Sequence, residues 1–432
     1  MIIQPSSNEK NLINLAVNVA GVHSPNPFWL ASAPPTNTAY QLLKAFEAGW
    51  GGAVWKTLTN NPIVNVSSRY GAWGLGRHKL IGMNNLELIS EKSVAQNCLE
   101  IAQVKAEFPN HAVVASLMFE TKQEWQEAVK ACEQAGVDGF ELNFGCPHGM
   151  CERGMGSTVG QNPALVEAIT NWVKAVATKP VFAKLTPNVT DIIPVGMAAQ
   201  AGGADAVTLI NTLNSVMGVD LQTLAPQPSV GGYSSHGGYS GLAVKPIALH
   251  MVSQLAMHPD FHLPISGIGG VGTWQDTVEF LALGASNVQV ATAVMHRGFA
   301  IIKPMISGLS SYLAEKQMAS VSELSGVSVS KLVPWEALDL NYQVKAHINA
   351  ATCIGCNLCY TVCDDAAYQA IAPALEGTIV PVILDDACVG CNLCSHVCPV
   401  ADCITMLPSS ASVDLPAVSW KNHPKNPKVS LS

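Results

Sequence analysis

The chain has 432 residues, of which 48% are hydrophobic and 12% are charged, and its formal net charge at pH 7 is -8. A chain of this length can form two or three domains with large cores. A negative charge without a basic cluster argues against a nucleic-acid-binding protein, and the longest apolar runs are too short to span a bilayer. The polar segment Met1–Lys10 lacks the pattern of a signal peptide, so we expect a soluble protein.

Short apolar runs alternate with longer helical patterns between Asn26 and about Met305. The runs expected to form strands are Phe28–Ser32, Ala53–Thr57, Val113–Leu117, Gly139–Asn143, Val181–Leu185, Ala206–Ile210, Pro264–Gly267 and Asn287–Val290. The segments expected to form helices between them include Glu87–Phe108, Lys122–Ala135, Pro163–Ala177 and Thr273–Leu283. Eight such β-then-α units predict a (β/α)8 TIM barrel. A doubly wound sheet is the alternative, but polar residues gather just after the predicted strands, where a barrel brings its loops to one rim.

The other domain boundaries are placed where the alternation of strands and helices stops. We place a barrel with an N-terminal extension at residues 1–310, a helical connector at 311–340, a cysteine-rich domain at 341–410 and a polar tail at 411–432. One loop, roughly Asn211–Ser240, is long and rich in Gly, Ser and Pro. Its length suggests a cover over a functional site rather than a plain connection.

Two kinds of polar residue recur near the ends of the predicted strands. Lys56 and Lys184 have apolar neighbours, and each could hold an anionic group or extend to solvent. Asn84, Asn85, Asn143 and Asn211, with Thr212 beside the last, include amide groups that both donate and accept hydrogen bonds. A ring of such amides suits a neutral planar ligand with alternating N–H and C=O groups.

Cys146 lies just after Asn143, at the start of a Gly-rich loop that runs to Gly156. A thiol with an ordinary pKa of about 8.5 is a feasible proton donor to carbon at neutral pH. It could also be a nucleophile, a metal ligand or an inert buried thiol.

The segment Gly267–Gly272 contains the G-x-G-x-x-G pattern of dinucleotide sites. It follows the seventh predicted strand, however, and does not open an N-terminal βαβ unit. In a barrel, the loops after strands seven and eight form a phosphate site from backbone N–H groups. We interpret these residues as the cradle of a single phosphate, with a simple tight turn as the alternative: Ile268, Gly269, Gly270, Ala291 and Thr292.

Two similar cysteine runs follow the barrel: Cys353-Ile-Gly-Cys356-Asn-Leu-Cys359-Tyr-Thr-Val-Cys363 and Cys388-Val-Gly-Cys391-Asn-Leu-Cys394-Ser-His-Val-Cys398. Both have the C-x₂-C-x₂-C-x₃-C spacing of [4Fe–4S] clusters, in which the fourth cysteine binds the neighbouring cluster. We therefore assign one cluster to Cys353, Cys356, Cys359 and Cys398, and the other to Cys388, Cys391, Cys394 and Cys363. Zinc knuckles and a disulfide framework are the alternatives, but zinc sites rarely place four cysteines in one short run. Free thiolates require reducing surroundings, which indicates the cytoplasm.

A phosphate cradle, two lysines at strand ends and two clusters together indicate FMN in the barrel. FMN exchanges two electrons with a substrate and single electrons with clusters, which nicotinamide does not do readily.

Several motifs resemble dihydropyrimidine dehydrogenases: Leu142–Gly156, Phe182–Asp191, Leu86–Lys92, Ser32-Ala-Pro-Pro and the paired cysteine runs. The resemblance extends from about Leu15 to Leu407, and the barrel is similar to that of dihydroorotate dehydrogenases. It implies that FMN in the barrel reduces the 5,6 double bond of uracil or thymine with electrons from NAD(P)H.

The resemblance also implies roles for single residues. Cys146 would protonate C5 while C6 receives the hydride, and His148 would assist the acid or order the loop. The residues expected to hold the pyrimidine are Asn85, Asn143, Phe144, Gly145, Asn211 and Thr212. Those expected to hold FMN are Ser32, Lys56, Thr57, Lys184, Gly241, Ile268, Gly269, Gly270, Ala291 and Thr292.

The sequence departs from the long members of this family, which carry FAD and NADPH domains ahead of the barrel. Nothing before Leu12 matches such domains, so the resemblance implies the catalytic subunit of a split bacterial enzyme. We expect a separate FAD- and NAD-binding flavoprotein as partner, and a homodimer within a hetero-oligomer. Cys151 stands where a small loop residue is expected. A dihydroorotate dehydrogenase and an electron-transfer subunit with a non-catalytic flavin barrel are the rival interpretations.

Overall fold

The structure is a computed structural model that describes residues 13–60, 63–75, 79–146, 155–409, 416–423 and 425–426. Internal contacts divide the chain into two compact units, Met1–Lys331 and Leu332–Ser432. Helix α10 (Ile302–Glu315) crosses residue 310, where the predicted barrel domain ends. It belongs to the first unit, because its residues Met305, Leu309 and Leu313 are buried in the barrel core. No helix of the described residues is long and apolar enough to cross a membrane.

The first unit contains a closed barrel of eight parallel strands whose spatial order follows the chain. The strands are β3 (Phe28–Leu30), β4 (Gly52–Leu58), β7 (Ala112–Leu117), β8 (Gly139–Asn143), β9 (Val181–Lys184), β10 (Ala206–Leu209), β15 (Ile265–Ile268) and β16 (Ala285–Val290). Strands β4, β7 and β8 are buried along their whole length, as parallel strands covered on both faces should be. The predicted TIM barrel is therefore confirmed, and each predicted strand ends within two residues of the observed one.

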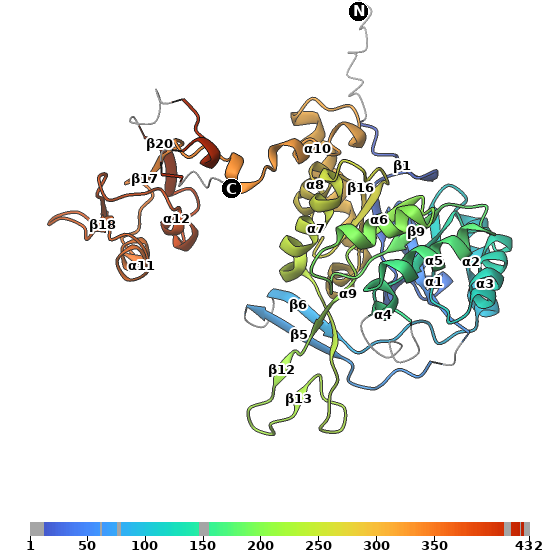
Figure 1. The fold of residues 1–432 in the computed structure, drawn as a ribbon. Helices are drawn as coiled ribbons and strands as arrows, with labels where there is room; N and C mark the ends of the chain where they lie inside the picture. Colours follow the sequence, from blue (N-terminus) through green and yellow to red (C-terminus); the bar gives the residue numbers. More distant parts are fainter. Residues whose placement is uncertain are drawn as a thin grey trace, which may run out of the picture. The chain divides into compact units, whose positions relative to one another are not determined.

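Helices surround the barrel (Figure 1). They are α1 (Ala39–Ala48), α2 (Val94–Glu107), α3 (Lys122–Gln134), α5 (Pro163–Lys174), α6 (Ile193–Ala201), α7 (Lys245–Met257), α8 (Trp274–Ala282) and α10, with the short helices α4 (Ser157–Gly160) and α9 (Thr292–Arg297). Short 3-10 turns are η1 (Pro34–Thr36), η3 (Leu242–Val244), η4 (Phe299–Ile301), η5 (Val321–Glu323) and η6 (Val329–Lys331). A hairpin of β1 (Val17–Val19) and β2 (Val22–Ser24) packs Val19 and Val22 against Trp29 of the barrel.

The start of α2 corrects the predicted helix Glu87–Phe108. The helix begins at Val94, because Ser93 caps it in a reciprocal box with Gln96. The seven residues before Val94 are not helical, which leaves Glu87 and its neighbours free to approach the barrel rim.

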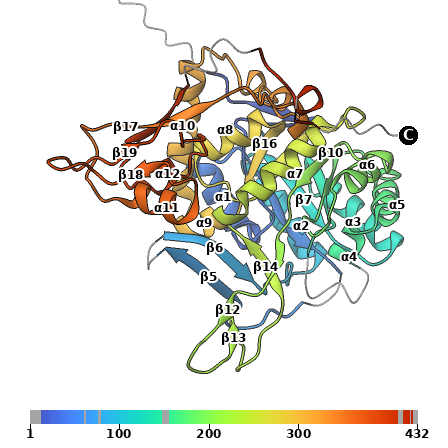
Figure 2. The same ribbon diagram turned by 60° about the vertical axis from the view of Figure 1, so that its left-hand side comes forward.

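A second sheet, which the sequence did not predict, covers part of the rim. Its four antiparallel strands run in the order β11 (Leu213–Ser215), β14 (Gly237–Ser240), β6 (Lys79–Asn85) and β5 (Tyr70–Leu75). The small hairpin of β12 (Gly218–Val219) and β13 (Pro226–Gln227) extends from it (Figure 2). This sheet joins the loop after β4 to the loop after β10, so the predicted loop Asn211–Ser240 is partly strand.

The second unit repeats one backbone motif around its two cysteine runs. Helices α11 (Leu358–Ala366) and α12 (Leu393–Val397) each follow an asparagine in the left-handed conformation, Asn357 and Asn392. Two antiparallel strand pairs complete the unit: β17 (Val344–Ile348) with β20 (Ile404–Pro408), and β18 (Ile371–Ala372) with β19 (Val382–Ile383). The turns η7 (Trp335–Ala337) and η8 (Trp420–Asn422) meet through the rings of Trp335 and Trp420, whose centroids lie 5.8 Å apart.

Candidate active site and iron–sulfur sites

A large cavity opens at the carboxyl ends of the barrel strands. It encloses about 1050 Å³ of space, including open solvent at its mouth. The carboxyl-end rim is where TIM barrels carry their active sites. Fifteen of the predicted barrel residues line it: Ser32, Lys56, Thr57, Asn85, Asn143, Cys146, Lys184, Asn211, Thr212, Gly241, Ile268, Gly269, Gly270, Ala291 and Thr292.

Phe144 and Gly145 do not line the cavity. The Phe144 side chain is 1% exposed and packs in the core, with its ring centroid 6.3 Å from that of Trp125. A Cβ on Gly145 would overlap Asn211, so the chain passes tightly behind that side chain. The Phe144 side chain thus packs in the core, and the expectation that Phe144 and Gly145 lie beside the pyrimidine stays a prediction.

Neighbouring groups fix the orientation of the asparagine amides. The Oδ1 atom of Asn143 accepts a hydrogen bond from Nδ2 of Asn211 at 3.0 Å and from the backbone N–H of Cys146 at 3.2 Å. The Nδ2 atom of Asn143 donates to Thr57 at 3.1 Å. On the covering sheet, Nδ2 of Asn85 donates to the carbonyl of Gly238 at 2.9 Å. These amides are therefore held in place before any ligand binds.

Cys146 lies in the cavity wall with 8% of its surface exposed. Its apolar neighbours are Ile63, Ile89, Met118 and Met155. Cys146 thus lines the cavity among apolar side chains. His148 and Cys151, for which the sequence suggested roles, lie outside the described residues.

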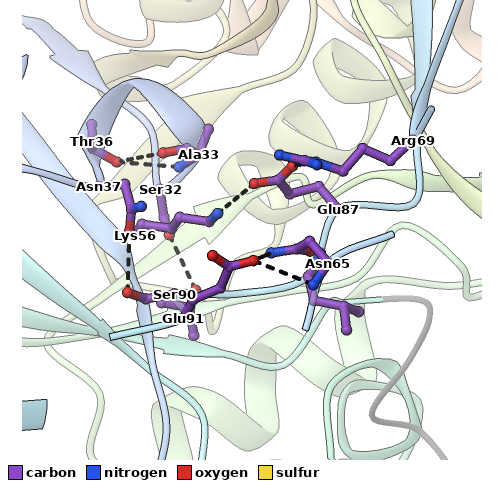
Figure 3. A network of polar contacts seen from close by, with 12 residues as sticks. Ser32, Ala33, Thr36, Asn37, Lys56, Asn65, Arg69, Glu87, Ser90 and Glu91 are labelled. Atoms are coloured by element: carbon purple, nitrogen blue, oxygen red, sulfur yellow. Dashed lines mark hydrogen bonds and ion pairs between the residues drawn. The ribbon is translucent and has the colours of Figure 1, made fainter. Parts of the chain in front are cut away.

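A network of charged groups borders the cavity on the side of the covering sheet (Figure 3). The ammonium of Lys56 lies 2.5 Å from one carboxylate oxygen of Glu87, and both side chains are less than 10% exposed. Arg69 and Tyr70 donate hydrogen bonds to the other oxygen. Burial acts to raise the pKa of Glu87, but its three donors outweigh burial and hold that pKa below its ordinary value. Lys56 is therefore paired within the site and does not extend to solvent.

The other predicted lysine is also paired. Lys184 lies at the end of β9, and its ammonium is 3.1 Å from a carboxylate oxygen of Glu141 on β8. Both residues are almost fully buried.

The predicted phosphate cradle lies after the seventh and eighth barrel strands. Gly269 and Gly270 have φ angles of +130° and +80°, which side chains rarely adopt. A Cβ on Gly270 would lie 2.7 Å from the Cβ of Lys245, so the turn also lacks room for one. Both glycines line the cavity, as do Ala291 and Thr292 after β16. Cavity size, glycine turn and lysines together fit an FMN whose phosphate lies at this turn.

Two hollows in the second unit gather the cysteines in the predicted quartets. One is lined by Cys353, Cys356, Cys359 and Cys398, and the other by Cys388, Cys391, Cys394 and Cys363. None of the described cysteines forms a disulfide. No group of three or more His, Cys, Asp or Glu side chains in the described part of the chain is arranged to hold a single metal ion. Four thiols around a wider hollow are the donor set that a [4Fe–4S] cube requires.

Sequence reasoning missed several residues of these sites. Glu87 and Tyr239 line the cavity through the covering sheet and the loop beside it, which the sequence did not predict. Gln289 also lines it, and alternation along β16 could have indicated this, since Ala291 two residues later was predicted. Cys403, a buried fifth thiol, lines the first cysteine hollow and directs its Sγ toward the carbonyl of Asn349.

Comparison with known proteins agrees with this geometry. Residues 14–313 match the dihydroorotate dehydrogenase family, and residues 346–406 match the 4Fe–4S dicluster domain. The NAD-dependent dihydropyrimidine dehydrogenase subunit PreA of Escherichia coli K12 is 42% identical over 359 residues, which are 83% of this chain and 87% of PreA.

Two further relatives are similar over most of this chain. The chloroplastic dihydropyrimidine dehydrogenase (NADP(+)) of Arabidopsis thaliana is 41% identical over 73% of this chain and 77% of its own. The catalytic subunit of dihydroorotate dehydrogenase B (NAD(+)) of Pyrococcus abyssi is 38% identical over 73% of this chain and 99% of its own. Its similarity to a dihydropyrimidine dehydrogenase subunit confirms the resemblance that its motifs predicted. The chain therefore belongs to the dihydroorotate dehydrogenase family, and a 4Fe–4S dicluster domain follows its barrel.

Proposed function

We propose that this chain reduces the 5,6 double bond of uracil or thymine. The observation that carries the proposal is the convergence of Cys146 and three asparagine amides on one cavity, beside two lysines and a glycine turn that fits a phosphate. A proton donor, a hydrogen-bonding frame for a planar ring and a flavin site are the parts that such a reduction needs.

Each group of residues has its own task in this proposal. When bound, FMN supplies the hydride that C6 of the pyrimidine receives. Cys146 holds the proton that C5 receives, so that two electrons and two protons are added in all. The amides of Asn85, Asn143 and Asn211, with Thr212, orient the ring through its N–H and C=O groups. Lys56, Lys184 and the glycine turn hold the flavin.

The charges of the cavity favour a neutral substrate over orotate. Among the described lining residues, the charged ones are Lys56, Lys184 and Glu87. Glu87 pairs with Lys56, and Glu141 pairs with Lys184. A carboxylate in this cavity would be desolvated beside Glu87 without a cation to itself, which is costly. These charges therefore favour uracil and thymine over orotate.

The two cysteine quartets support an electron path from outside the barrel. Each would hold one [4Fe–4S] cluster, which carries single electrons to FMN. The electrons would come from NAD(P)H through a separate subunit that binds FAD and NAD, because the glycine turn after β15 belongs to a barrel and not to a nicotinamide-binding fold. We place this complex in the cytoplasm, with the chain as a homodimer within a hetero-oligomer.

A half-reaction tests the proposal. The chain loaded with FMN and clusters is reduced with dithionite without oxygen and mixed with uracil, thymine or orotate, and flavin absorbance is followed. Uracil or thymine should reoxidise the flavin and give the dihydropyrimidine, while orotate should not. A faster reaction with orotate would identify a dihydroorotate dehydrogenase. No reaction with any of the three would favour an electron-transfer subunit.

A further inference from the structure

Glu141 lies at the centre of the barrel and has no solvent exposure. It is the middle residue of β8, two positions before Asn143. Its Oε1 atom accepts a hydrogen bond from Nζ of Lys184 at 3.1 Å. Its Oε2 atom accepts from Oγ1 of Thr208 at 2.9 Å and from Nε2 of Gln289 at 2.9 Å. Both carboxylate oxygens are thus used, and every partner donates, as an ionised carboxylate requires.

The partners of Glu141 come from three other strands, and two of these partners line the cavity although Glu141 does not. Lys184 of β9 and Gln289 of β16 both line the cavity, whereas Glu141 and Thr208 of β10 lie behind its wall. Glu141 therefore acts on the contents of the cavity only through other side chains.

Glu141 also helps to orient the side chain of Gln289 in the barrel wall. Its Nε2 atom donates to Glu141 and also to Ser266 at 3.1 Å, which fixes the orientation of the amide. Its Oε1 atom is buried and has no hydrogen-bond partner among the described residues. Gln289 is 1% exposed, so this oxygen lies within the barrel wall, and its amide is held through Nε2 alone.

We propose that Glu141 is a positioning residue that sets the reduction potential of the flavin. It fixes Lys184, offsets part of the positive charge that Lys184 brings to the cavity, and holds the amide of Gln289 in one orientation. The proposal rests on the proposed function only in requiring FMN in this cavity.

The sign of the effect follows from charge. The reduced flavin is anionic, so a cation in the wall raises its potential and an anion behind the wall lowers it. Buried charges act over long distances, because the effective dielectric constant is near 20 and not 80. A unit charge about 10 Å away then changes an equilibrium constant on the order of tenfold.

Glu141→Gln is the main test, since it removes the charge and keeps the shape. Sulfite adds to oxidised flavin and leaves negative charge on its pyrimidine part, so the dissociation constant of sulfite reports the local charge. We expect Glu141→Gln to bind sulfite about tenfold more tightly, and its flavin potential to rise by about 30 mV for a two-electron couple. Lys184→Met should shift both quantities in the opposite direction, which general damage to the site would not do.

Two further variants complete the design. Thr208→Val removes one hydrogen bond to Glu141 without changing a charge, and should leave sulfite binding within about threefold of the parent. The double variant Lys184→Met/Glu141→Gln replaces a buried pair by neutral groups, which proteins often tolerate better than a single unpaired charge. If Glu141→Gln alone loses its flavin, the double variant is compared with Lys184→Met. These two proteins differ only in the charge of residue 141, so the double variant should bind sulfite more tightly than Lys184→Met.

All measurements are made without pyrimidine, on the full chain with its flavin and clusters. The role of Glu141 would be overturned if Glu141→Gln bound FMN and its affinity for sulfite were unchanged. It would also be overturned if Thr208→Val changed the affinity for sulfite as much as Glu141→Gln does. Either result would leave the proposed function standing. A parent chain that binds no FMN at all would overturn the assignment of the cavity, and the proposed function with it.

Discussion

Single residues of the cavity work in pairs, in which one side chain fixes another. Asn211 donates to Asn143, Glu87 pairs with Lys56, and Glu141 pairs with Lys184. Paired groups lose little freedom when a ligand binds, so the cavity is organised in advance. Cys146, the proposed proton donor, also packs against the apolar side chains of Ile89 and Met118.

Replacing Cys146 tests the proton donor. Cys146→Ala should keep FMN and both clusters but lose about 10²–10⁴-fold in pyrimidine turnover. Cys146→Ser should also be slow, because a hydroxyl is a much weaker acid than a thiol. Cys98→Ala is the matched control, since that thiol lies on α2 beside Cys132 and outside the cavity. Turnover of Cys146→Ala within a few-fold of the parent would exclude Cys146 as the acid.

Replacing Glu87 tests the preference for a neutral ring. Glu87→Gln leaves Lys56 without its anion, so orotate should inhibit the variant at concentrations about tenfold lower than those that inhibit the parent, while uracil turnover falls. Inhibition constants measured with uracil as substrate give the comparison. Glu91→Gln is the control, because Glu91 binds Asn65 and does not line the cavity (Figure 3). Unchanged orotate inhibition in Glu87→Gln would show that this carboxylate does not select against anions.

The sequence predicted half of the residues that line the cavity, because polar residues at the ends of parallel strands must meet at one rim. It could not predict that the Phe144 side chain packs against Trp125, because the direction of that side chain depends on how the chain leaves β8. It also gave Glu87 no role, since its place depends on the true start of α2 and on contacts from Arg69 and Tyr70.

Secondary-structure elements differ in how well local pattern reveals them. The barrel strands are short, mostly apolar runs between amphipathic helices, and this pattern predicted all eight. The covering sheet pairs Asn85 with Gly238, residues far apart in the chain. Its strand β5 is mostly exposed, so no alternation of apolar and polar residues marks it. Long-range pairing of exposed strands leaves little local signal.

The glycine turn after β15 is the element that should decide flavin affinity. Gly270→Ala forces a Cβ into a position with φ near +80° and only 2.7 Å from the Cβ of Lys245, so FMN should bind at least about tenfold more weakly. Fluorescence titration of the flavin-free chain measures this.

Gly272→Ala is the control for this variant. Its added Cβ would meet first the movable end of Arg297, at 2.8 Å. Equal FMN affinity in the two alanine variants would place the phosphate elsewhere.

The whole molecule joins a barrel unit to a unit with two cysteine hollows. Eight of eleven positions match between the two cysteine runs, and their left-handed asparagines show the same turn in each. In each run the fourth cysteine lines the hollow of the other run. The spacing predicted this exchange because it is typical of two-cluster domains.

Exchange of the fourth cysteine has a testable consequence. Cys363→Ser should impair the cluster of the second run, although Cys363 belongs to the first run by sequence. Iron content and electron paramagnetic resonance of the reduced protein would show this, with Cys403→Ser as a control that keeps both quartets. Loss of the first-run cluster instead would mean that each run binds its own cube.

The central claim is that electrons from the clusters reach a neutral pyrimidine in the barrel. The most direct measurement is formation of dihydrouracil by the purified chain, loaded with FMN and clusters, with reduced viologen or with NADH as the electron source. The account predicts steady product with viologen and almost none with NADH until a flavoprotein partner is added. No dihydrouracil with viologen, from protein whose FMN and clusters are intact, would contradict it.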